Sequence, residues 1–64
     1  MRATYAYRTR ADGVIHHESF DTFWKALNRA EYDVDQNSSA VEPLSITVAD
    51  TIFDWGHIRI LLDQ

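Results

Sequence analysis

Hydrophobic and polar residues alternate along the first segment of the chain, from Arg2 to Arg10. Tyr5 and Tyr7 fall on one face of this segment, and a period of two rich in Tyr and Thr predicts a β-strand with one solvated face. The Asp12-Gly13 pair comes next, and Gly accepts the positive φ angle of a tight turn. Since Val14 to Glu18 can form the returning strand, the pattern predicts a β-hairpin.

The pattern then changes to helical spacing, which predicts an amphipathic helix from roughly residue 20 to residue 32. Ser19 or Asp21 is expected to cap this helix, because a side-chain oxygen accepts a hydrogen bond from a free amide of the first turn. Lys25 and Arg29 lie on the polar side. The apolar stripe, which we expect to supply much of the core, consists of Phe20, Phe23, Trp24, Leu27 and Ala30.

Residues 33–39 are polar and turn-forming, so they are expected to form a loop. The segment Leu44–Ala49 alternates again and predicts a strand, and Asp54-Trp55-Gly56 has the character of a turn before a last strand over His57–Leu62. Either a bulge or a wider loop is expected over 50–56. The predicted order is therefore ββαββ in the α+β class, with one amphipathic helix packed on a small antiparallel sheet.

The chain has 64 residues and no cysteine, which indicates a single domain over residues 1–64 without a disulfide framework. A domain of this size buries only about 60% of its unfolded surface, so a deep substrate cavity would remove core that it needs. The longest wholly apolar run is Ile60-Leu61-Leu62, far shorter than the ~20 residues that cross a bilayer. We therefore expect a soluble protein, without membrane contact, in the cytoplasm of its cell or of a phage host.

Catalytic chemistry is not indicated by any residue pattern. His16 and His17 are adjacent, so on a strand they point to opposite faces and cannot easily share a metal ion with each other. No serine lies in a Gly-x-Ser-x-Gly elbow, and only Gly13 and Gly56 are present, so no phosphate-cradling loop exists. The sequence predicts a non-enzyme with no catalytic residue, cofactor or metal; a functional role for His16, His17 or His57 is the weaker alternative.

The segment after the predicted helix resembles part of a calcium-binding loop, because Asp33, Asp35 and Asn37 occupy alternate positions. An EF-hand also requires Gly at its sixth position and a bidentate Glu at its twelfth. Here those positions hold Ser38 and Leu44. The pattern favours a solvated loop over a calcium site.

Charge is distributed unevenly along the chain, whose formal net charge is −4. Residues 1–30 carry five basic and three acidic side chains, for a net charge of +2, whereas residues 31–64 carry one basic and seven acidic side chains, for −6. One interpretation is simple solubility; the other is an anionic surface that binds a basic groove. The predicted partner-binding residues on that surface are Glu31, Asp33, Asp35, Glu42, Asp50 and Asp54.

With these acidic residues beside the aromatic segment Phe20–Trp24, the chain resembles the small acidic phage anti-CRISPR proteins. They are short, cysteine-free and non-catalytic, and often combine a small sheet with a helix. The resemblance is one of overall type, without a shared motif, and it carries no functional residue over. It implies an inhibitor that mimics DNA and occludes the nucleic-acid-binding groove of a CRISPR effector, such as a type I surveillance complex.

An alternative interpretation is a small oligomerising structural or accessory module that acts through sheet-edge pairing. Either interpretation gives a protein partner, and the protein itself is expected to be a monomer or a weak homodimer. Direct nucleic-acid binding is disfavoured, because the net charge is negative and the basic residues are few.

Overall fold

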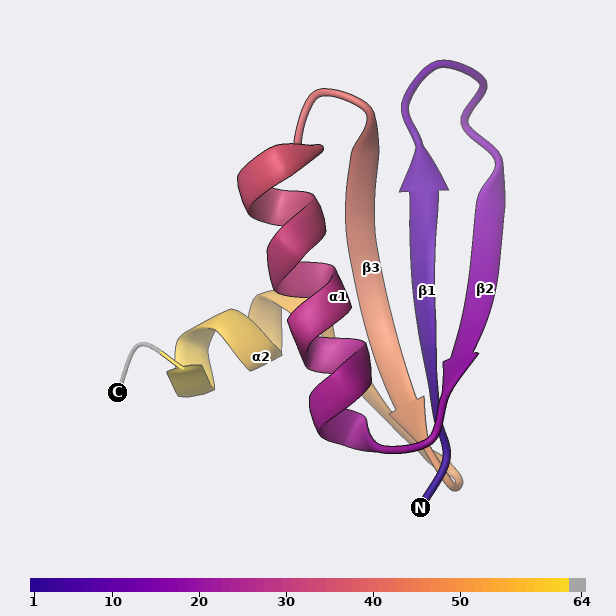
Figure 1. Ribbon diagram of the computed structural model, residues 1–64, viewed down its shortest axis with the longest axis vertical. Coiled ribbons are helices and arrows are strands. Elements are labelled where there is room, and N and C mark those ends of the chain that lie inside the picture. Colours follow the sequence, from indigo (N-terminus) through magenta and orange to yellow (C-terminus); the bar gives the residue numbers. More distant parts are fainter. Residues whose placement is uncertain (63–64) are drawn as a thin grey trace.

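The computed structural model describes residues 1–62, which form one antiparallel sheet and two helices (Figure 1). The sheet has the strand order β2-β1-β3-β4, so the first strand lies in its interior. The α+β class is confirmed, and the predicted ββαββ order is roughly matched, with a fourth strand that lies earlier than predicted and a second helix after it. The elements are β1 (Ala3–Thr9), β2 (Ile15–Phe20), α1 (Phe23–Gln36), β3 (Val41–Val48), β4 (Thr51–Asp54) and α2 (Trp55–Leu62).

The predicted first hairpin is present as β1 and β2, which pair from Ala3↔Phe20 to Arg8↔Ile15. Gly13 has a φ angle of +70°, as the turn requires. The Asp12 carboxylate accepts hydrogen bonds from the Thr9 hydroxyl and from the Val14 amide, the latter at 3.0 Å. These two hydrogen bonds hold the pKa of Asp12 below its ordinary value, the Thr9 hydroxyl having the larger effect.

Helix α1 begins and ends later than the sequence predicts. Its N-cap is Thr22, whose hydroxyl accepts a hydrogen bond from the Lys25 amide at 3.2 Å, so the predicted caps Ser19 and Asp21 are wrong. Ser19 belongs to β2 instead. The helix continues to Gln36, so the expected loop over residues 33–39 is helical in its first half.

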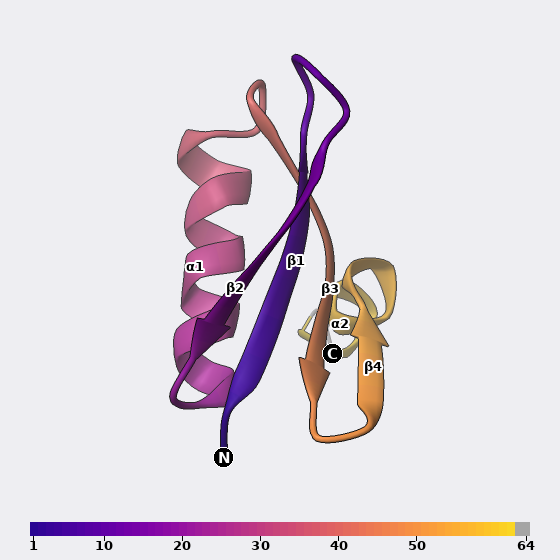
Figure 2. The same cartoon turned by 90° about the vertical axis from the view of Figure 1, so that its right-hand side faces the viewer.

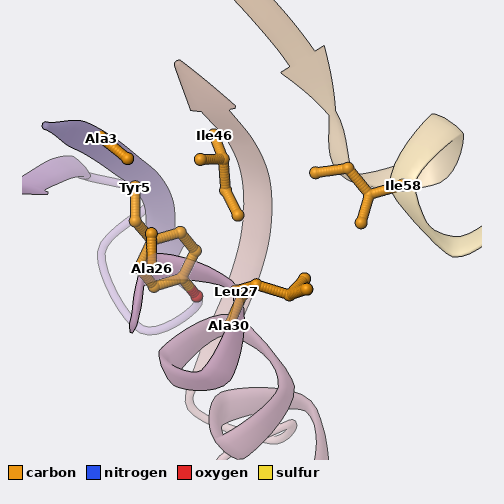
Figure 3. Close-up of a cluster of buried hydrophobic side chains, with 7 residues drawn as sticks. All are labelled: Ala3, Tyr5, Ala26, Leu27, Ala30, Ile46 and Ile58. Atoms are coloured by element: carbon orange, nitrogen blue, oxygen red, sulfur yellow. The ribbon is translucent and has the colours of Figure 1, made fainter. Parts of the chain in front are cut away.

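The core lies between α1 and one face of the sheet (Figure 3). From α1, small side chains allow a close approach to the strands, and Leu27 fills the space toward α2. Of the predicted stripe, Leu27 and Ala30 are buried, Phe20 and Phe23 are partly buried against the core, and Trp24 is exposed. The buried cluster consists of Ala3, Tyr5, Ala26, Leu27, Ala30, Ile46 and Ile58.

The last third of the chain differs most from the prediction. Residues 51–54 form β4 where a bulge or wide loop was expected, and Ala49 and Asp50 form the connecting turn. Residues 55–62 form the helix α2 in place of a turn and a strand. The reason is tertiary: only Ile58 of α2 is buried, and it inserts beside Leu27 and Ile46 (Figure 3).

The two helices occupy different places around the sheet. Helix α1 covers one face, and α2 lies at the β4 edge, opposite to the β2 edge (Figures 1 and 2). With the helices in these places, no helix within residues 1–62 covers the second face of the sheet. This open face carries Thr4 and Ala6 of β1, Ser45 and Thr47 of β3, and Ile52 of β4.

No helix within residues 1–62 is long and apolar enough to span a membrane.

Candidate protein-binding surface

Asp33, one of the predicted partner-binding residues, lies inside the protein. Only 3% of its surface is exposed, and one of its carboxylate oxygens accepts a hydrogen bond from the Tyr5 hydroxyl at 2.8 Å. The other oxygen accepts one from the Asn37 side-chain amide at 3.1 Å and lies 3.7 Å from Nε of Arg29. The prediction of a surface contact is therefore wrong for Asp33, whose carboxylate joins α1 to β1.

Burial and the same hydrogen bond together keep Tyr5 in its neutral form. Burial, followed by the hydrogen bond to the Asp33 carboxylate, raises the pKa of the Tyr5 phenol far above its ordinary value. Tyr5 therefore remains a neutral hydrogen-bond donor under all physiological conditions. The pair is structural and leaves no charge on the surface for a partner.

The other predicted acidic residues are spread over the molecule. Glu42 lies on β3 and forms an exposed ion pair with Arg8 at 3.6 Å, on the open side of the sheet. Asp50 lies in the β3–β4 turn, and Asp54 ends β4. Only Glu31 and Asp35 are brought together, since both are exposed on α1 and line one cleft. The six residues do not form a single acidic patch.

The carboxylates also differ in whether they form ion pairs. Within residues 1–62, Lys25 pairs with Asp21, and Arg29 pairs with both Glu18 and Asp33, while Glu42 has Arg8. Each of these pairs has N–O distances of 3.6–3.7 Å. The predicted acidic residues that form no ion pair with any described residue are Glu31, Asp35, Asp50 and Asp54.

Trp24 was expected in the core, but 68% of its surface is exposed. Phe23 takes the inward position instead and packs edge-on against Phe53 of β4, with ring centroids 6.0 Å apart. Counting from Trp24, steps of four, three and four residues reach Asn28, Glu31 and Asp35, and such steps follow one side of a helix. We call these four residues the α1 ridge: Trp24, Asn28, Glu31 and Asp35.

The acidic end of the α1 ridge borders a shallow cleft between the two helices, with a volume of about 270 Å³. Glu31, Val34 and Asp35 of α1 line one side, and Arg59 of α2 lines the other. No histidine, serine or threonine is among these residues, so the cleft offers no proton-transfer or nucleophilic group suited to neutral pH beyond two carboxylates. Its chemistry suits recognition of charged groups.

The three histidines are exposed and lie apart. His16 stacks on Tyr7 with ring centroids 5.3 Å apart, on the side of the sheet that faces α1. His17 pairs across from Ala6 on the other side, and His57 lies in α2. Among the described residues, no group of three His, Asp or Glu side chains is placed to hold a metal ion.

The α1 ridge could be found from the sequence only in part. Glu31 and Asp35 were predicted from charge, whereas Trp24 was assigned to the core because it also fits the apolar spacing. Comparison with protein-family models, with curated proteins and with solved structures finds no match.

Proposed function

We propose that this domain is a non-catalytic binding protein whose α1 ridge docks into a basic groove of a protein partner. The observation that carries the proposal is the exposed indole of Trp24 on the same line of α1 as two unpaired carboxylates. Exposure of a large apolar side chain forgoes about 1.5–3 kcal/mol of burial energy. Trp is also among the residues that most often anchor protein interfaces.

The charge of the ridge supports a basic partner. Glu31 and Asp35 form no ion pair with a described residue, so their two negative charges, only partly offset by Arg59 across the cleft, attract a basic group. Tyr32, also more than half exposed, lies next to the ridge on the outward side of the helix. An amphipathic helix presenting aromatic anchors beside carboxylates is suited to docking into a groove whose walls are apolar and basic.

Grooves that bind nucleic acids have this basic character. The proposed partner is therefore a protein with a nucleic-acid-binding groove, which the domain would occupy in place of DNA or RNA. An anti-CRISPR inhibitor that acts on a type I surveillance complex, in the cytoplasm of the infected cell, is the specific form of this proposal. It rests on the resemblance of sequence type together with the α1 ridge.

The test compares the affinity of two surface variants for a purified type I surveillance complex. We expect Trp24→Ala and Glu31→Lys/Asp35→Lys each to weaken binding at least about tenfold, the usual effect of removing an interface anchor. Binding of the unmodified domain should also weaken steeply with salt, because salt screens surface charges. Target DNA should compete with the domain for the complex.

Matched controls separate binding from folding. Asp50→Lys makes the same charge change as one of the two reversals, in a distant turn, and should leave affinity within about twofold, since surface substitutions away from the contact act weakly. All these variants should keep the melting temperature, because each changed residue is exposed. In contrast, Leu27→Ala removes buried packing and should cost about 2–5 kcal/mol of stability. If the folded Glu31→Lys/Asp35→Lys variant bound as tightly as the unmodified domain, the α1 ridge would be ruled out as the docking surface.

A further inference from the structure

Strand β2 forms an open edge of the sheet. It pairs with β1 on one side only, and in Figure 1 no described element lies beyond it. The strand, Ile15–Phe20, contains no proline or glycine that would block further pairing. The opposite edge is less available, because β4 has only four residues and continues directly into α2.

The backbone groups that point outward from β2 follow from the hairpin. The Thr9 amide donates to the Val14 carbonyl at 3.0 Å, while the Val14 amide donates to Asp12, so half of a hydrogen-bonded Thr9–Val14 pair is formed and the Val14 carbonyl points to β1. Such pairs alternate along an antiparallel ladder. The N–H and C=O groups of His16, Glu18 and Phe20 therefore point to β1, and those of Ile15, His17 and Ser19 point to solvent.

We propose that a second copy of this chain pairs antiparallel with β2, with His17 opposite His17 of the second copy. The two sheets would then join into one continuous sheet. This register uses all three outward-facing residues, because Ile15 lies opposite Ser19 on each side of the central pair. A register shifted to place Glu18 at the centre pairs only His17 with Ser19 and sets two carboxylates directly opposite each other, which is destabilising.

Side-chain complementarity supports the register centred on His17. On the side that faces α1, it places His16 of one copy opposite Glu18 of the other, and Val14 opposite Phe20. Arg29 already lies 3.6 Å from Glu18, so the carboxylate would lie between a guanidinium group and an imidazole that can donate a hydrogen bond. Val14 is 47% exposed in the single chain and would be covered by Phe20. The edge is thus complementary to itself in both polar and apolar contact.

The register can be tested by cross-linking, because the described chain and its full sequence contain no cysteine. Residues opposite each other in a hydrogen-bonded antiparallel pair have Cα atoms about 5.5 Å apart, within the range that a disulfide bridges. Two copies of His17→Cys should therefore oxidise to a disulfide-linked dimer. In Ser19→Cys, the two thiols would be four residues out of register, about 14 Å apart along the strands.

We expect His17→Cys to cross-link at least about tenfold faster than Ser19→Cys, because only the former brings two thiols within disulfide range. Both positions are exposed on the same face of β2, so they report register rather than accessibility. Equal rates, or faster cross-linking of Ser19→Cys, would overturn the proposal.

Sedimentation equilibrium of cysteine-free variants provides the second measurement, with the chain mass of 7.4 kDa as the monomer reference. His17→Pro removes an outward-pointing N–H without touching the β1 ladder and should raise the dimer Kd at least about tenfold. Glu18→Lys should do the same, and His16→Glu/Glu18→Lys should restore dimerisation by placing a carboxylate opposite the new lysine. A wild-type protein that stays monomeric at millimolar concentration, or a charge swap without rescue, contradicts β2 pairing. The dimer leaves the α1 ridge uncovered, so this outcome is independent of partner binding.

Discussion

The hydrogen bond between Tyr5 and Asp33 joins residues that are 28 positions apart and closes the α1–sheet interface. Tyr5→Phe keeps the ring but leaves a buried carboxylate oxygen without its donor, which costs about 1–3 kcal/mol. Because domains of this size have a total stability of about 3–5 kcal/mol, the loss should be easily measured by urea denaturation. Tyr7→Phe is the control. The Tyr7 ring stacks on His16, and its hydroxyl forms no hydrogen bond with a described residue. An equal effect of the two variants would contradict the special role of Tyr5.

Because of the same pair, we expect the stability of the domain to fall at alkaline pH in a way that depends on Tyr5. The pKa of Tyr5 is raised in the folded state, above the value of about 10 in the unfolded chain. Above pH 10 the unfolded state therefore binds fewer protons, and the free energy of unfolding falls as pH rises. Below pH 10 this contribution is fully present. Urea denaturation between pH 8 and pH 11 should show a steeper loss in wild type than in Tyr5→Phe, and parallel curves would refute it.

Single residues also show which features of the structure could not be predicted from the sequence. The sequence places the Asp33 carboxylate in a loop after the helix, whereas its burial inside α1 depends on Tyr5, which no local pattern connects to it. Trp24 and Phe23 both fit the apolar spacing, and only the position of Phe53 in β4 determines that Phe23 turns inward. Ala26 was overlooked because alanine carries a weak hydrophobic signal, although it is fully buried.

The backbone is strained at one residue in the turn of the β3–β4 hairpin. Ala49 has a φ angle of +54° in the two-residue turn, a left-handed conformation that costs a non-glycine residue about 1–2 kcal/mol. Ala49→Gly removes that cost and should raise stability by up to about 1 kcal/mol, after the added entropy of the unfolded glycine is subtracted. Ala40→Gly, in a turn without positive φ, should instead be neutral or destabilising. Thermal melts of both variants test this, and destabilisation by Ala49→Gly would contradict the strain.

Elements with strong local signals were predicted well, and those that depend on distant packing were not. The first hairpin follows from alternation and Gly13, and α1 follows from its long periodic stripe. In the last segment, Ile58, Ile60 and Leu62 alternate as in a strand, while Trp55, Ile58 and Leu62 fit a helix equally well. Short apolar runs satisfy both periods. The insertion of Ile58 beside Leu27 decides the outcome, and this contact is not visible in the sequence.

For the molecule as a whole, α2 is the least firmly attached element. Ile58 is its only buried residue, Trp55 is partly buried, and among the described residues α2 packs only on β3, β4 and the core around Leu27. We expect α2 amides to exchange with solvent through local opening, with protection below that of β1, β3 and α1, which exchange near the global unfolding free energy. Ile58→Ala should abolish the protection of α2 while the central strands keep most of theirs. Equal protection across all elements in wild type would show that α2 unfolds only with the domain.

The interior position of β1 has a consequence during protein synthesis. Its pairing with β2 is local and can form within about 1–10 μs, but its other partner, β3, follows on the order of 40 residues later. At a synthesis rate of about 5–20 residues per second, β1 waits for roughly 2–8 s before β3 exists. Throughout that interval the outer backbone groups of the nascent β1–β2 hairpin have no strand to pair with, and Tyr5 lacks its contact with Ile46. The strand that ends at the centre of the finished sheet is therefore the one longest at risk of pairing with a neighbouring nascent chain.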